Sequence, residues 1–163
     1  MLQSNTKPVF LVDAMLGNIA KKLRLLGYDS EYSSDCNDDD LILRAKNENR
    51  VLLTKDVLLQ KKAKKQSIPV FYVENNTELE QLAQIFRNLR LSKVTISGST
   101  YRCTNCNGKL EIVEKNKITN KVPEGVFEKI DNFWKCTNCN KIYWEGTHIE
   151  RLQKFVDELN EKL

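Results

Sequence analysis

The sequence lacks any long apolar run. No stretch approaches the roughly 20 consecutive apolar residues that a membrane-spanning helix needs. The first residues, MLQSNTKP, also lack the apolar centre of a secretory signal peptide. We therefore expect no membrane association and a cytoplasmic location, where thiols stay reduced.

The sequence also lacks the motifs of several enzyme classes. It has one histidine, His148, no Gly-rich phosphate loop and no Ser/His/Asp arrangement. A haloacid-dehalogenase-type phosphatase needs a second aspartate two positions after the one that ends its first strand, but Met15 follows Asp13 at that distance. A phosphate-accepting receiver domain needs an acidic pair there, and Asp13 stands alone. The sequence therefore disfavours these classes.

What the sequence does have is the composition of a folded, mildly basic protein. Of its 163 residues, 40% are hydrophobic and 29% are charged, which disfavours disorder. This length suits one domain with a small appendage. The net charge of +4 permits a polyanionic partner. Four lysines gather in QKKAKKQ and either bind phosphate or form an ordinary solvated helix face: Lys61, Lys62, Lys64 and Lys65.

Short β-rich runs alternate with helical patterns between residues 9 and 90. Strands are expected at 9–12, 29–34, 50–54 and 68–73. Helical patterns follow each of them: the first ends at Gly27 as a C-terminal cap, and the others cover 38–49, 57–66 and 77–90. This alternation predicts parallel strands joined by crossovers, and hence a three-layer α/β/α domain.

Beyond a linker at 91–100, two near-identical segments, CTNCN at 103–107 and 136–140, each contain a Cys-x2-Cys pair. Each pair can place two thiolates on one tight turn, and two such turns give four sulfurs for a tetrahedral Zn²⁺. The predicted zinc ligands are Cys103, Cys106, Cys136 and Cys139. Because four cysteines leave no open coordination position, we expect a structural zinc on which the folding of this small module depends.

Disulfides and isolated redox motifs are the two alternatives to zinc for these cysteines. The expected reducing environment disfavours both of them. Cys36 lies outside the pattern and is expected to be a free thiol. His148 either contacts phosphate or closes the ribbon against the last helix, and it is left out of the zinc ligand set because four thiolates suffice.

Aspartates follow two of the expected strands and open one helix. Asp13 ends the run VFLV, Asp56 follows VLLT, and 38–40 is the acidic run DDD. The carboxyl ends of parallel strands meet at one edge of a sheet, so these side chains can converge there. Grouped carboxylates repel each other, and Mg²⁺ or Mn²⁺ relieves that repulsion. Such ions activate water to attack a phosphodiester, which is nuclease chemistry. For 38–40, stabilisation of a helix N-terminus accounts for the acidic residues equally well.

Taken together, six segments resemble the Mut7-C RNase domain family of PIN-like ribonucleases. In chain order they are FLVDAMLGNIAKKLRLLGYD, DDDLILRA, RVLLTKD, YRCTNCNGKL, VPEGV and FWKCTNCNKIYWEGTH, and they span residues 9 to 150. The resemblance implies metal-dependent cleavage of RNA by a PIN-like α/β/α domain with a parallel sheet, followed by a zinc ribbon. We place the nuclease domain at 8–92, the ribbon at 100–147 and a C-terminal amphipathic helix at 148–163.

Carried over by position, the resemblance assigns catalytic roles and Mg²⁺ or Mn²⁺ binding to Asp13, Asp38, Asp39 and Asp56. Asp40 matches a position that is often merely acidic. Lys55 stands where the family usually has arginine, which keeps the charge but loses the bidentate phosphate geometry.

The leading hypothesis is a Mg²⁺- or Mn²⁺-dependent endoribonuclease with a structural zinc. RNA phosphates would be bound by Lys21, Arg24, Lys55, Lys61, Lys62, Lys64 and Lys65. The alternative is a non-catalytic zinc-ribbon module that binds RNA or assists ribonucleoprotein assembly on a retained nuclease scaffold, and a toxin-like role is a third reading. The RNA substrate, endonucleolytic or exonucleolytic cleavage, ribonucleoprotein partners and the oligomeric state are not fixed by the sequence.

Overall fold

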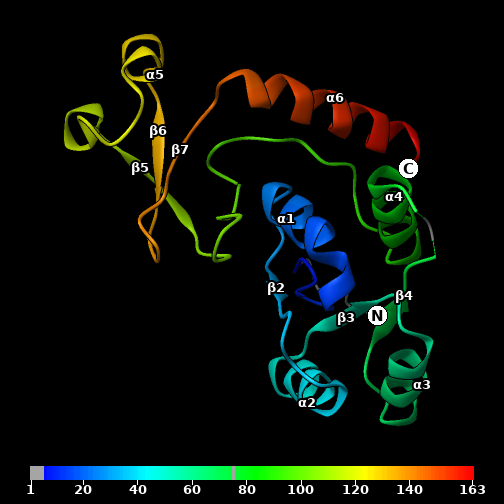
Figure 1. Ribbon diagram of the computed structural model, residues 1–163. Coiled ribbons are helices and arrows are strands. Elements are labelled where there is room, and N and C mark those ends of the chain that lie inside the picture. The colour runs from blue at the N-terminus through cyan, green and yellow to red at the C-terminus, as the bar shows by residue number, and fades with distance from the viewer. Residues whose placement is uncertain (1–5, 75) are drawn as a thin grey trace.

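The structure, a computed structural model, describes residues 6–74 and 76–163 (Figure 1). Four parallel strands form the larger sheet in the order β2-β1-β3-β4. Their bounds are Phe10–Val12 for β1, Ser30–Tyr32 for β2, Val51–Thr54 for β3 and Val70–Tyr72 for β4. The predicted parallel sheet and mixed α/β class are confirmed.

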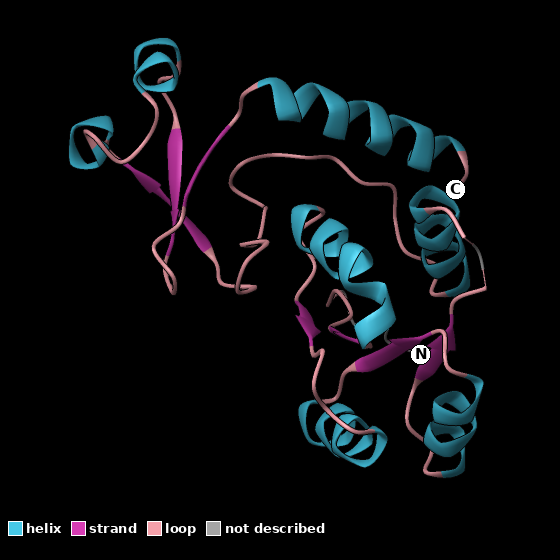
Figure 2. Ribbon diagram, viewed as in Figure 1, coloured by secondary structure: helices cyan, strands magenta, loops and turns pink. Residues whose placement is uncertain are grey.

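Helices cover both faces of this sheet (Figure 2). A short 3-10 helix, η1 (Ala14–Leu16), leads into α1 (Gly17–Leu25), which lies on one face with α4 (Glu78–Asn88) and α6 (Thr147–Glu161). The other face carries α2 (Asp38–Glu48) and α3 (Val57–Lys65). Among the described residues, no helix is long and apolar enough to cross a membrane.

The apolar runs of the sequence follow from burial on both faces of the sheet. β1 is central, and successive side chains of a strand point to opposite faces. Phe10 and Val12 therefore join the core under α1 and α4, while Leu11 joins the core under α2 and α3. A strand covered on both sides is apolar at every position, as VFLV is.

The turn after α1 is fixed by Gly27. Its φ of +87° lies in the left-handed region, and a Cβ there would lie 2.9 Å from the carbonyl oxygen of Thr100. The N–H of Gly27 donates to Arg24 and the N–H of Tyr28 donates to Leu23, at 3.0 and 2.9 Å. This pattern ends a helix at a glycine, as predicted.

The smaller sheet is antiparallel, in the order β5-β6-β7. Its strands are β5 (Leu110–Val113), β6 (Phe133–Cys136) and β7 (Ile142–Trp144). Two short helices that the sequence did not indicate, η2 (Lys115–Ile118) and α5 (Glu124–Lys129), connect β5 to β6. From β7 the chain returns along α6 to α4 (Figure 1), where the side chain of Asn160 makes two 2.8 Å hydrogen bonds to the backbone of Val94 in the linker.

Candidate active site and zinc centre

Asp13 lies directly after β1 and begins η1. Its Oδ1 accepts a 2.7 Å hydrogen bond from the N–H of Ala14, and its own N–H donates to Leu53 at the end of the neighbouring strand. Because β1 is buried, the backbone that carries this carboxylate is held rigidly. Asp13 itself is half-buried at the carboxyl edge of the sheet.

Thr54 connects Asp13 to Asp56. The buried hydroxyl of Thr54 donates to Oδ2 of Asp13 at 2.8 Å and accepts from the N–H of Asp56 at 2.9 Å. The Oδ1 of Asp56 in turn accepts from Leu58 and Leu59, so Asp56 is the N-cap of α3. A carboxylate oxygen can accept more than one hydrogen bond, so the contacts of Asp13 leave acceptor positions for a further ligand.

Asp13 and Asp56 occupy the topological switch point of the sheet. β1 and β3 are neighbours, but the helices that follow them, α1 and α3, lie on opposite faces (Figure 1). Where adjacent strands of an open α/β sheet send their helices to opposite sides, a crevice opens at the carboxyl ends of the strands. The ends of β1 and β3 are therefore the edge at which a ligand is expected.

The acidic run 38–40 begins α2, beyond the end of β2. Asn37 is the N-cap, and its Oδ1 accepts from the N–H of Asp40 at 2.9 Å. Asp39 forms a 3.0 Å ion pair with Lys62 of α3. Both side chains are exposed, so the pair adds little stability. Asp38, Asp39 and Asp40 lie in the first turn of α2, where their negative charges stabilise the helix N-terminus, as the sequence allowed.

The structure does not gather the four predicted aspartates into one compact group. We looked for groups of three or more Asp, Glu, His or Cys side chains that lie close enough to share a metal ion. Within residues 6–74 and 76–163, the four cysteines form the one such group. Asp13 and Asp56 are joined through Thr54, whereas Asp38 and Asp39 stand at the start of α2. Mg²⁺ commonly uses one or two carboxylates with waters and substrate phosphate, so the donor chemistry of Asp13 and Asp56 is suitable for it.

Exposed apolar side chains surround this pair. Met15 and Leu58 are 71% and 73% exposed, and Val57 and Tyr32 are also exposed. Met15 follows Asp13 by two positions, Val57 and Leu58 follow Asp56, and the Tyr32 hydroxyl donates to the carbonyl of Ala14 at 2.9 Å. The edge that carries the carboxylates is therefore apolar as well as acidic.

The predicted phosphate-binding residues differ in exposure. Lys55 is half-buried after β3, and the exposed ones are Lys21, Lys61, Lys62, Lys64 and Lys65. Arg24 requires a correction, because it is only 6% exposed and its guanidinium donates to the carbonyls of Ser30 and Thr104, both at 2.8 Å. Burial lowers the pKa of Arg24. Its role is to join α1, β2 and the first cysteine turn, not to contact surface phosphate.

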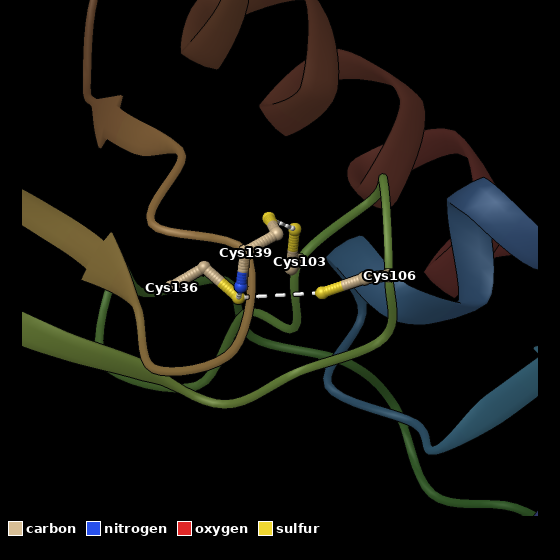
Figure 3. A group of neighbouring side chains, drawn as sticks. All are labelled: Cys103, Cys106, Cys136 and Cys139. Atoms are coloured by element: carbon tan, nitrogen blue, oxygen red, sulfur yellow. Dashed lines mark hydrogen bonds between the residues drawn. The ribbon is translucent and has the colours of Figure 1, made fainter.

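The four cysteine sulfurs converge, as predicted (Figure 3). They lie within 4.8 Å of one another, with 3.5 Å between Cys103 and Cys139 and 3.4 Å between Cys106 and Cys136. Zn–S bonds of about 2.3 Å in a tetrahedron place sulfurs about 3.8 Å apart. The donor set and its spacing therefore fit a closed structural zinc site.

Backbone and side-chain donors surround these sulfurs. The N–H groups of Asn138 and Cys139 both point to Cys136 Sγ at 3.4 Å. Burial opposes ionisation of Cys106, but hydrogen bonds from Asn138 and Gly108 outweigh it and lower the pKa of that thiol to about 6. A Cβ at Gly108 would lie 2.8 Å from Cys136 Sγ, so only glycine fits there.

Tyr143 supports the same centre from β7. Its hydroxyl lies 3.0 Å from Cys103 Sγ and accepts the N–H of Thr104 at 3.0 Å. Burial, together with Cys103, raises the pKa of Tyr143 to about 12. The hydroxyl therefore keeps its proton and can donate it to the sulfur, as groups around metal ligands commonly do.

Asn107, the last residue of the first CTNCN segment, attaches the cysteine turn to the parallel sheet. Its Oδ1 accepts the N–H of Ser30 at 3.0 Å, and its Nδ2 donates to Asp29 at 2.8 Å and to Glu31 at 3.0 Å. The first of these bonds satisfies the N–H of Ser30 in β2, an edge strand that would otherwise present it unpaired. Asn107 has a positive φ of 66° and Asn140, its equivalent in the second segment, has 67°.

Sequence reasoning missed three residues of these sites: Thr54, Asn107 and Tyr143. The repeat CTNCN carried a signal for Asn107, because asparagine tolerates the left-handed conformation that follows such a turn. For Thr54 and Tyr143 the partner lies far away in sequence or depends on the sheet register, so no local pattern identified them.

Comparison with known proteins gives one finding about the whole chain. The family model described as the Mut7-C RNAse domain matches residues 8–156, which is nearly all of it. A search of curated proteins finds no significant match.

Proposed function

The chain belongs to the Mut7-C RNase domain family, and from this membership we propose that it is a Mg²⁺- or Mn²⁺-dependent, PIN-like ribonuclease that hydrolyses RNA phosphodiester bonds, with endonucleolytic cleavage expected. The single observation that supports this most is the Asp13–Thr54–Asp56 chain of hydrogen bonds at the switch point of the sheet. A pair of carboxylates fixed to the ends of buried strands is suited to hold a hard divalent cation.

In this proposal Asp13 and Asp56 would hold the cation, which when bound would supply polarisation of water and of the phosphodiester oxygens. The chain's own residues supply geometry. Thr54 holds the Asp13 carboxylate in one rotamer, and the N-cap bonds of Asp56 to Leu58 and Leu59 hold the second carboxylate. Asp38, which is half-buried, and Asp39, which is exposed, begin α2 and would offer further acceptors.

Substrate would be held by the surroundings of this pair. The exposed lysines of α3 follow Asp56 along the same helix and offer positive charge to phosphates. Met15 and Leu58 offer apolar surface on which unpaired bases can rest. This combination favours single-stranded RNA over a duplex, whose bases are already stacked and paired.

The test is a cleavage assay in which only the exchangeable metal varies. Zinc-loaded protein is dialysed free of other divalent ions, incubated with end-labelled single-stranded RNA, and then supplied with Mg²⁺ or Mn²⁺. We expect cleavage only after metal addition, and loss of at least 100-fold in rate for Asp13→Asn and Asp56→Asn. Asp131→Asn, a 90% exposed carboxylate on the ribbon, is the control and should cleave like wild type. Metal-independent cleavage, or wild-type rates in both site variants, would refute the proposal.

A second function has one observation in its favour. Since the four aspartates do not form a compact group in the described chain, a module that binds RNA without cutting it is the alternative. It would show tight RNA binding without turnover in any metal. For single strands, the logarithm of its affinity should fall by about 0.7 per neutralised phosphate for each log unit of salt.

A further inference from the structure

A cavity of about 660 Å³ lies where the zinc ribbon meets α1 and α6. Its size is within the range of about 300–1,000 Å³ that small-ligand sites occupy. Aromatic side chains from four segments form much of its lining: Tyr101, Trp134, Tyr143, Trp144 and Phe155. This cavity is not part of the carboxylate site, because Lys22 and Leu25 line it from the last turns of α1, whereas Asp13 precedes that helix.

Two polar atoms of the lining residues have no partner. The hydroxyl of Tyr101 and the indole N–H of Trp134 are buried without a hydrogen bond, and Tyr101 is only 8% exposed. Leaving a buried donor without a hydrogen bond is unfavourable. Gly98 packs against the Trp134 indole so closely that a Cβ would come within 2.4 Å of it, which holds that ring in place. The cavity thus presents flat aromatic surface, while these two polar atoms are buried behind it.

The charged lining of the cavity has one sign. Lys22, Lys141 and Arg151 line it, with His148 beside them, and no acidic side chain is among its lining residues in the described chain. Lys22 Nζ lies 4.5 Å from the Phe155 ring centre and 4.0 Å from Glu78, and Lys141 Nζ lies 5.0 Å from the Tyr143 ring centre. Cations beside aromatic rings are the combination that stacks a base and binds its phosphate.

We propose that this cavity binds an unpaired nucleotide of single-stranded RNA, with the base among Tyr101, Trp134 and Trp144 and the phosphate on Arg151 and Lys141. The aromatic rings offer the base flat faces, and the cations offer its phosphate positive charge. The inference rests on the proposed function only in taking RNA as the ligand. It gives the enzyme a second contact with its substrate, away from the carboxylates, so that one strand is held at two points.

The cavity has a built-in reporter. The sequence contains two tryptophans, and both line this cavity. Full-length zinc-loaded protein carrying Asp13→Asn is titrated with a single-stranded RNA 12-mer, its duplex, and an abasic strand with the same backbone, while intrinsic fluorescence is followed. We expect single-stranded RNA to quench the tryptophans saturably, and the abasic strand and the duplex to leave them unchanged.

Matched variants on α6 distinguish RNA binding in this cavity from a general effect of positive surface charge. Arg151 and Lys154 are both exposed cations of α6, but only Arg151 lines the cavity. Arg151→Ala should weaken binding of the 12-mer at least fivefold by anisotropy and reduce the salt slope by about 0.7, whereas Lys154→Ala should change affinity by less than twofold.

Three results would overturn the proposal. They are RNA binding that leaves tryptophan fluorescence unchanged, equal effects of Arg151→Ala and Lys154→Ala, and quenching by the amphipathic anion anilinonaphthalene sulfonate but not by RNA. The last would assign the cavity to a small amphipathic ligand. Cleavage is scored separately with wild-type protein, so a ribonuclease without this cavity contact and an RNA-binding cavity without cleavage give different results.

Discussion

Single hydrogen-bonding side chains fix the geometry of both candidate sites. Thr54 is the clearest case, because its one hydroxyl donates to Asp13 and accepts from the backbone of Asp56. A hydrogen bond to a charged group is worth about 1.5–3 kcal/mol, so its loss frees a carboxylate that the proposed chemistry needs in one orientation. Thr54 is thus a positioning residue and not a catalytic one.

Replacing Thr54 with valine tests this role. Valine keeps the shape but removes the hydroxyl, and we expect the cleavage rate to fall about tenfold, which corresponds to about 1.4 kcal/mol. RNA affinity should stay within twofold, because Thr54 is buried and contacts no surface phosphate. Thr54→Ser restores the hydroxyl and should recover most of the rate. A valine variant as fast as wild type, or a serine variant as slow as valine, would contradict the role.

Asp29 gives the fold a pH dependence. Burial opposes its ionisation, but hydrogen bonds from Arg50 and Asn107 outweigh burial and hold the pKa of Asp29 below its usual value of 3.8. A carboxyl with a depressed folded pKa stabilises the native state above its unfolded pKa, and this stability is lost as pH falls through the folded pKa.

Urea unfolding from pH 7 to pH 3 measures this contribution. Asp29→Asn should be less stable than wild type by about 1–2 kcal/mol at neutral pH, and the difference should shrink below pH 4. Zinc loss in acid affects both proteins and cancels in the difference. A difference that stays constant across this pH range would show that Asp29 titrates alike in both states.

At the scale of elements, the main feature is the docking of the first cysteine turn on β2. Asn107 makes three hydrogen bonds to 29–31, and Arg24 adds bonds to Ser30 and Thr104 from α1. The edge of the parallel sheet is thereby covered by the zinc centre. The metal and the sheet are linked through one asparagine.

The two CTNCN segments provide a matched test of this docking. Asn107→Ala and Asn140→Ala both lose a residue suited to positive φ, at a shared cost of about 1 kcal/mol. Only Asn107→Ala also leaves the Ser30 N–H unpaired and removes one hydrogen bond each from Asp29 and Glu31, which keep their arginine partners, so it should be less stable than Asn140→Ala by about 1–3 kcal/mol in urea unfolding. Equal losses of stability would show that the docking contributes nothing.

The parallel-sheet elements were predictable because their signal is local. Apolar runs such as VFLV and VLLT, Gly27 and the acidic start of α2 indicated strands and helix ends that the structure confirms. Arg24 was misjudged because helical spacing does not reveal that a segment 80 residues later covers it. The helices η2 and α5 were missed because they are short and largely exposed, with little apolar periodicity.

At the scale of the whole molecule, the chain closes on itself through α6. Leu152, Val156 and Leu159 are buried in the same core as α1 and α4, so the last helix returns from the ribbon to the helices that cover one face of the parallel sheet (Figure 1). The ribbon is therefore held to the sheet both by its first cysteine turn and by the helix that follows it.

Removal of zinc should loosen the molecule in a defined order. We expect one zinc per chain, and its chelation should remove amide protection from 100–147 and from β2, while β1 and β3 stay protected. The physical reason is that the ribbon depends on the metal, whereas the central strands are buried by helices. Hydrogen exchange with and without zinc measures this. Protection of 100–147 that survives verified zinc loss would contradict the structural role of the metal.

The central claim is that Asp13 and Asp56 hold a divalent cation at the switch point of the sheet. The most direct measurement is an anomalous-difference map from crystals of the zinc-loaded protein soaked in Mn²⁺. We expect a manganese peak within about 2–2.5 Å of carboxylate oxygens of Asp13 or Asp56, and its loss in Asp13→Asn crystals. Manganese sites elsewhere, with none beside these carboxylates, would contradict the account and favour an RNA-binding module without catalysis.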